Sequence, residues 1–112
     1  MYMILFVLND PQKLDMILDS WKKSGVGGTT IYESTGAFRK RMRIPGRFAY
    51  TTENLDEYNV TLMSVVQNET IVQNCLAETE NVVGDLSNPD TGIFCYWELN
   101  GVKGLHKNYS AE

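Results

Sequence analysis

Hydrophobic and polar positions along the chain follow two periods, about 2 and about 3.6 residues, which predict strands and helices respectively. Residues 1–8 and 93–99 are apolar at nearly every position, and residues 29–34 and 59–66 are rich in strand-forming residues. Helical spacing of apolar residues occurs in two segments (Leu14, Ile17, Leu18 and Trp21; then Ile71, Val72, Cys75, Leu76, Thr79 and Val82). The predicted order is strand, helix, strand, strand, helix, strand.

The ends of both helices carry local signals that agree with this pattern. Asp10 followed by Pro11 is typical of a helix start, and Gly25 is typical of a helix end. Asn68 and Gly84 have the same roles around the second helix.

Two similar β-α-β halves predict an α+β, ferredoxin-like βαββαβ fold with a four-stranded antiparallel sheet and two helices on one face. The other face of such a sheet faces water only if its strands alternate apolar and polar residues. The first and last strands do not alternate, so we expect a second layer over that face. Association of identical subunits is the simplest source of this layer.

Length and composition are those of a small globular protein. Its 112 residues, 43% of them hydrophobic, are typical of a single globular domain, which we expect to span residues 1–112. Residues 1–8 lack the basic start and the cleavage site of a signal peptide. Cys75 and Cys95 lie in apolar runs and are expected to be buried free thiols, so we expect a cytoplasmic location.

Positive charge is concentrated in one segment. Five of the ten Lys and Arg residues lie close together (Arg39, Lys40, Arg41, Arg43 and Arg47), and the rest of the chain carries the other five against all fourteen acidic residues. Apolar and aromatic side chains alternate with these cations (Phe38, Met42, Ile44, Phe48 and Tyr50). The segment is either a solvated loop or an arm that binds a partner, and the separation of charge favours the arm. Single-stranded RNA is a less favoured partner, because the net charge of −4 argues against nucleic-acid binding.

Several motifs in this order resemble the PII signalling proteins, the trimeric nitrogen regulatory family. They are the helix start PQKLD at 11–15, the turn GVGGTT at 25–30, GAFR at 36–39 and the strand IFCYWEL at 93–99. The resemblance covers roughly residues 3–105. It implies a homotrimer, a flexible T-loop at about 36–57 and a C-terminal tail at about 104–112.

The resemblance also implies a nucleotide site in the clefts between subunits. The residues that match it, or that lie beside matching positions, are Thr30, Gly36, Phe38, Arg39, Asp90, Thr91, Gly92 and Lys103. The basic residues of the T-loop (Arg39, Lys40, Arg41, Arg43 and Arg47) would contact a target protein, such as a membrane transporter or a metabolic enzyme.

Departures from the family pattern fall on its charged positions. A phosphate-binding lysine is replaced by Gly92, a cleft glutamate by Met63, and a C-terminal Arg-x-Arg by Lys103-Gly-Leu105. Lys40 replaces the glutamine that helps to hold magnesium and 2-oxoglutarate, and Ile44 stands near the position of the modified tyrosine. These changes favour AMP, ADP or another small anionic metabolite over a triphosphate as effector, and an empty cleft stays open as an alternative.

We therefore expect a non-enzymatic regulator without a metal site. One alternative is a CutA-like trimer that binds a metal or another small molecule, although Cys75, Cys95 and His106 do not have the spacing of metal ligands. Another is a small ferredoxin-like enzyme that uses His106 as an acid or base. That histidine lies in a polar, glycine-rich tail, which favours a solvated side chain.

Overall fold

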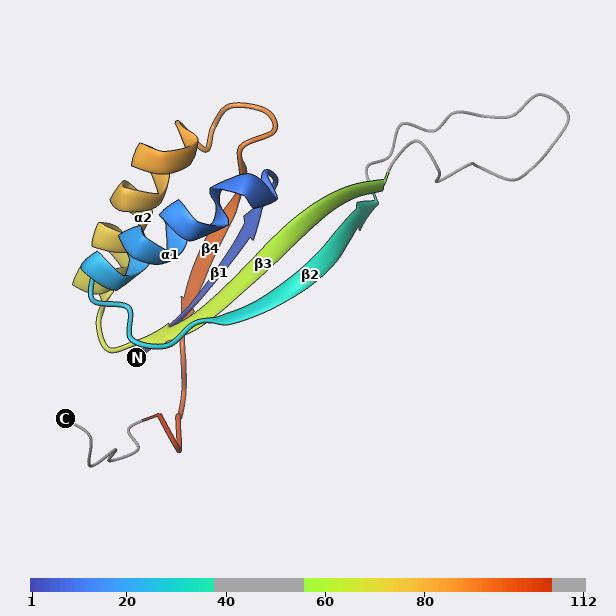
Figure 1. Ribbon diagram of the computed structural model, residues 1–112. Helices are drawn as coiled ribbons and strands as arrows, with labels where there is room; N and C mark the ends of the chain where they lie inside the picture. Colours follow the sequence, from blue (N-terminus) through green and yellow to red (C-terminus); the bar gives the residue numbers. More distant parts are fainter. Residues whose placement is uncertain (38–55, 106–112) are drawn as a thin grey trace, which may run out of the picture.

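The computed structural model describes residues 1–37 and 56–105, and contains four strands and two α-helices in the predicted order (Figure 1). The strands are β1 (Tyr2–Leu8), β2 (Thr30–Ala37), β3 (Asp56–Val66) and β4 (Gly92–Glu98). The helices are α1 (Leu14–Lys23) and α2 (Glu69–Val83), and a short 3₁₀ turn, Pro11–Lys13, precedes α1.

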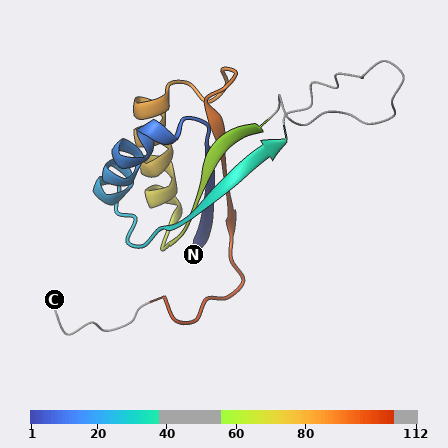
Figure 2. The same cartoon turned by 45° about the vertical axis from the view of Figure 1, so that its right-hand side comes forward.

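The strands form one sheet in the order β2-β3-β1-β4, and every neighbouring pair is antiparallel. Both helices cover the same face of this sheet, as two views of the molecule show (Figures 1 and 2). The α+β architecture is therefore confirmed, and it is compatible with the ferredoxin-like arrangement.

Helix ends follow the sequence signals. The Asp10 carboxylate accepts a hydrogen bond from the Gln12 amide at 3.0 Å, although the turn that it caps is 3₁₀ and the α-helix begins only at Leu14. The Asn68 side chain accepts from the Ile71 amide at 2.9 Å and caps α2. Both caps satisfy amides that a helix start would leave unpaired.

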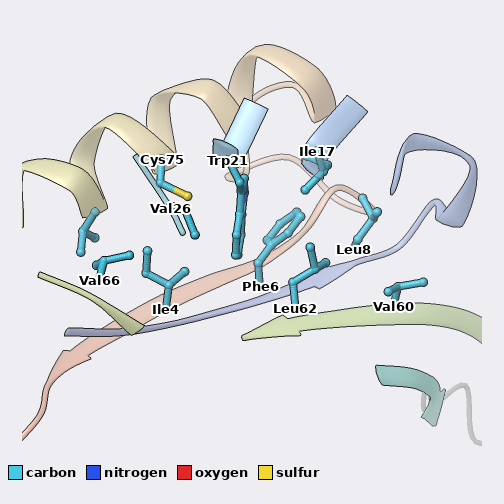
Figure 3. Close-up of a cluster of buried hydrophobic side chains, with 11 residues drawn as sticks. Ile4, Phe6, Leu8, Ile17, Trp21, Val26, Val60, Leu62, Val66 and Cys75 are labelled. Carbon is cyan, nitrogen blue, oxygen red and sulfur yellow. The ribbon is translucent and has the colours of Figure 1, made fainter. Parts of the chain in front are cut away.

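The core lies between the sheet and the two helices (Figure 3). Alternate residues of β1 and β3 point into it, and α1 and α2 contribute the side chains above them (Ile4, Phe6, Leu8, Val60, Leu62, Val66, Ile17, Trp21, Val26, Val72 and Cys75). The Trp21 ring meets Phe6 and Phe94 at centroid distances of 6.3 and 6.5 Å. These apolar contacts fix both helices on the sheet.

Candidate functional site

Strands β2 and β3 extend beyond the rest of the sheet as a two-stranded ribbon. β1 pairs with β3 only from Val60 onward, whereas β2 and β3 pair from Thr30 opposite Met63 out to Ala37 opposite Asp56. The residues of the ribbon, 34–37 and 56–59, therefore pair only with each other, and the ribbon projects away from the helices (Figures 1 and 2). Gly36 and Glu57, expected at the ends of the loop, lie opposite each other in this ribbon.

The predicted partner-binding residues follow the ribbon in the sequence. Phe38, Arg39, Lys40, Arg41, Arg43 and Arg47 lie outside the described residues, between the end of β2 and the start of β3. The ribbon thus places Ala37 and Asp56, the residues on either side of 38–55, opposite each other at one end of the sheet.

The face of the sheet opposite the helices is apolar. Residues directly opposite each other in antiparallel strands share a face, so the strand register defines it as Met3, Leu5, Val7, Thr61, Met63, Val65, Ile93, Cys95, Trp97, Thr30 and Tyr32. We call this set the open face. None of its members carries a charge, and Ile93 and Trp97 are 63% and 43% exposed.

A hollow of about 520 Å³ lies on the open face where β2 begins. Its described lining comes from β1, β2, β3, the loop before β2 and the C-terminal segment (Met3, Gly28, Thr29, Thr30, Tyr32, Met63, Ser64, Val65 and Leu105). The Ser64 hydroxyl donates to the Gly28 carbonyl oxygen and ties the loop to β3. The volume is within the range of small-molecule sites.

A single chain does not bring the predicted site residues together. Thr30 lines the hollow, and Gly36 lies further along the same strand, in the ribbon. Asp90, Thr91 and Gly92 lie away from the hollow, on the opposite edge of the sheet from β2 and at the end from which the ribbon projects, where Gly92 is opposite Leu8. Lys103 follows the other end of β4 and is exposed, two residues before Leu105 of the hollow.

The loop between α2 and β4, expected to face phosphate, uses its own amides internally. The Leu86 amide donates to the Glu80 carboxylate at 3.0 Å, and the Ser87 amide donates to the Asp85 carboxylate at 2.8 Å. The Asn88 amide donates to the Asp85 carbonyl oxygen at 3.0 Å. The hydrogen bonds from Ser87 hold the pKa of Asp85 below its usual value. These three amides are therefore already paired and do not form a phosphate-binding nest.

Gly92 has a packing role in this structure. Its φ is +136°, and a Cβ atom built there would lie 2.4 Å from the Val7 carbonyl oxygen. A lysine could not take this position without moving the backbone.

The two cysteines differ in their exposure to solvent. Cys75 is buried in the core, and burial raises the pKa of its thiol to about 12, so it stays protonated at neutral pH. Cys95 was expected to be buried too, and this is wrong: it is an exposed free thiol on the open face, because β4 is an edge strand with one uncovered side. Within residues 1–37 and 56–105, no group of three or more His, Cys, Asp or Glu side chains is placed to hold a metal ion.

Sequence reasoning found Thr30 but missed most of the hollow. The PII resemblance had aligned Met63 and Leu105 with cleft positions where a charge is lost, whereas Met3 and Val65 were assigned only to strands. The apolar lining residues of the strands share one feature that could have indicated the hollow: they lie on the side of a strand that no helix covers.

Comparisons with protein-family models and with curated proteins found no match to this chain. The PII resemblance therefore stays a prediction from the motifs. Of the helices in the described part of the chain, none is long and apolar enough to cross a membrane.

Proposed function

We propose that the protein is a PII-like, non-enzymatic signalling protein. In this proposal it is a ferredoxin-like homotrimer that binds a small anionic effector such as AMP or ADP between its subunits. The basic T-loop then controls a target protein, which could be a membrane transporter or a metabolic enzyme.

The ribbon is the observation that carries this proposal. Strand β2 runs from Thr30 in the hollow to Ala37, where the basic segment begins. One continuous pair of strands thus runs from the hollow towards the largest concentration of positive charge in the sequence. A ligand that prefers one geometry at the base of the ribbon would change how the basic segment is presented.

The effector's charge would be met by cations outside the hollow. Lys103 is two residues from Leu105 of the hollow. The end of β2 at Ala37 lies about 23 Å from Thr30, at about 3.3 Å per residue, so Arg39 would have to come from another subunit. Because three amides of the loop after α2, those of Leu86, Ser87 and Asn88, are already paired, fewer groups are left for a long phosphate chain. This supports a mononucleotide or diphosphate over a triphosphate.

The open face supports association of subunits. An apolar surface of this kind, with Ile93 63% exposed on an edge strand, is stabilised when another layer excludes water from it. Copies of the same chain would also bring the separated residues Thr30, Asp90 and Lys103 of different subunits closer together.

A substitution on the open face tests the association. We expect light scattering to give about 38 kDa for the wild type, three times the 12.7 kDa of one chain. Ile93→Glu should shift the mass to that of a monomer, because burying an unpaired carboxylate costs several kcal/mol. Met16→Glu is the matched control: Met16 is 51% exposed on α1, away from this face, and the mass should not change. A monomeric wild type would refute the trimer.

Blocking the hollow tests the effector site. A Cβ atom at Gly28 or at Gly27 meets nothing within 4 Å, so the backbone leaves room for a side chain to start at either position, but only Gly28 lines the hollow. In calorimetric titrations with AMP, ADP, ATP, 2-oxoglutarate and bicarbonate, we expect saturable binding of AMP or ADP to the wild type. Gly28→Leu should weaken it at least about tenfold, and Gly27→Leu should not. The effector proposal is wrong if nothing in the panel binds, and the assignment to the hollow is wrong if Gly28→Leu binds normally.

A further inference from the structure

We propose that residues 100–105 form a strap that is held against the hollow by Leu105 and closes over the effector when it binds. Closure rests on the proposed function, because it concerns the ligand of that same site. The contact of Leu105 with the hollow does not depend on that function.

The strap begins where the chain leaves the sheet after β4. The Leu99 amide donates to the Met1 carbonyl oxygen at 2.9 Å, which extends the pairing of β4 with β1 by one residue. Among the residues that the structure describes, this is the last backbone hydrogen bond between this end of the chain and the sheet. The chain then runs past the end of the sheet at which the N-terminus lies (Figures 1 and 2). Residues 100–105 therefore lie outside the ladder of hydrogen bonds that fixes β4.

Leu105 is the residue through which the strap meets the hollow. It lines the hollow together with Met3 of β1 and Thr30 of β2, whereas none of the described lining residues comes from β4. The sheet order places β1 between β4 and the other two strands, so the strap has to pass β1, a distance of about 4.8 Å, to reach them. A chain of this length can span about 20 Å. The strap is thus long enough to contact the hollow and also to move away from it.

The sequence of the strap provides one anchoring side chain. Val102 and Leu105 are its two apolar residues and are 38% and 37% exposed, but only Leu105 lines the hollow. Gly104, directly before Leu105, has a φ of +94°, which an L-residue rarely adopts. The φ of Gly101 is not positive. Gly104 therefore makes the turn that brings Leu105 to the hollow.

A ligand in the hollow would favour the closed strap. Leu105 is the described lining residue that comes neither from a strand nor from the loop before β2. A ligand that fills the hollow gives this side chain more surface to cover, and covering it excludes water from the site. The strap then closes by as much as the ligand binds the closed state better than the open one.

Limited trypsin digestion tests the anchoring role of Leu105 without any ligand. Lys103 is exposed within the strap, so cleavage after it, identified by mass spectrometry, reports how often the strap is released. Leu105→Ala should raise this rate at least about threefold, and the equally exposed Val102→Ala should not. Each rate is divided by that of a peptide with the sequence of residues 98–110 and the same change. Equal corrected rates for the two variants would overturn the anchoring role.

Titration with AMP and ADP tests closure. Leu105→Ala and Gly104→Ala should each weaken binding at least about fivefold, the first by removing the cover and the second by straining the turn. Val102→Ala and Gly101→Ala are the matched controls and should bind as the wild type does, since neither residue lines the hollow. Saturating ADP should also slow cleavage after Lys103 at least about threefold in the wild type, and by less than half as much in Leu105→Ala.

The outcomes separate the two proposals. If neither nucleotide binds the wild type, the effector proposal fails and closure fails with it, while the cleavage rates of the free variants still decide on the anchor. If a nucleotide binds and cleavage after Lys103 is equally fast with and without it, closure is overturned and the effector proposal stands. Light scattering and thermal melting check the assembly and folding of each variant.

Discussion

Gly92→Ala should destabilise the protein by about 3 kcal/mol or more, which makes it one of the two most damaging single substitutions that we predict. At φ +136° an L-residue is strained, and the added Cβ atom would lie 2.4 Å from the Val7 carbonyl oxygen and 3.0 Å from the Phe6 ring. The carbonyl belongs to β1, in the centre of the sheet, so relief would need β4 to move away from its partner. Urea denaturation measures the free energy of unfolding.

Substitutions at two other glycines distinguish backbone strain from steric collision as the cause of the lost stability. Gly84 also has a positive φ, +89°, with ψ −174°, a conformation that is essentially restricted to glycine, but a Cβ atom there meets nothing within 4 Å, so Gly84→Ala should cost about 1–2 kcal/mol, less than Gly92→Ala. Gly27→Ala has neither problem and should leave stability nearly unchanged. If Gly92→Ala and Gly84→Ala cost the same, the close approach of β4 to Val7 is not present in solution.

Thr79→Val should cost about 2 kcal/mol although the two side chains have nearly the same shape. The Thr79 hydroxyl accepts from the Trp21 ring N–H at 2.9 Å and donates to the Cys75 carbonyl oxygen at 2.7 Å, and all three residues are buried. Valine would leave the indole N–H without a partner in the core, which is the expensive part of the change.

The matched variant is Thr79→Ser, which keeps the hydroxyl and should lose less than half as much stability. Replacing Trp21 with Phe removes the N–H, so Trp21→Phe/Thr79→Val should cost less than the sum of the single changes in a double-mutant cycle. Strict additivity of the two changes would show that the hydrogen bond does not contribute to stability.

The helices and the buried strands could be predicted because each has a face in the core. Periodicity located α2 to within a residue at each end, and Asn68 caps it as expected. The outer parts of β2 and β3 were not predicted, because residues 35–37 and 56–58 pair only with each other and the sequence shows no apolar periodicity there. Pairing between distant segments defines these strands, and a local pattern does not contain that information.

The candidate site was predictable in part for a similar reason. Thr30, Met63 and Leu105 were aligned with cleft positions by the resemblance, whereas the hollow also needs Met3 and Val65, which are far apart in the sequence and meet only across the sheet. Cys95 was placed in the core because an apolar run does not say which strand will be at the edge.

The β2–β3 ribbon has a consequence for how such a chain can change. Its outermost pair joins Ala37 to Asp56, the residues on either side of 38–55. The register of the sheet is therefore fixed by the paired residues of β2 and β3, whatever sequence lies between them. Lengthening a closed loop is inexpensive, with each doubling costing only about 0.6 kcal/mol. The segment is therefore replaceable as a unit: a different one could be grafted onto Ala37 and Asp56, and under the proposed function it would direct the same sheet to another target, while the hollow at the base of the ribbon is inherited unchanged.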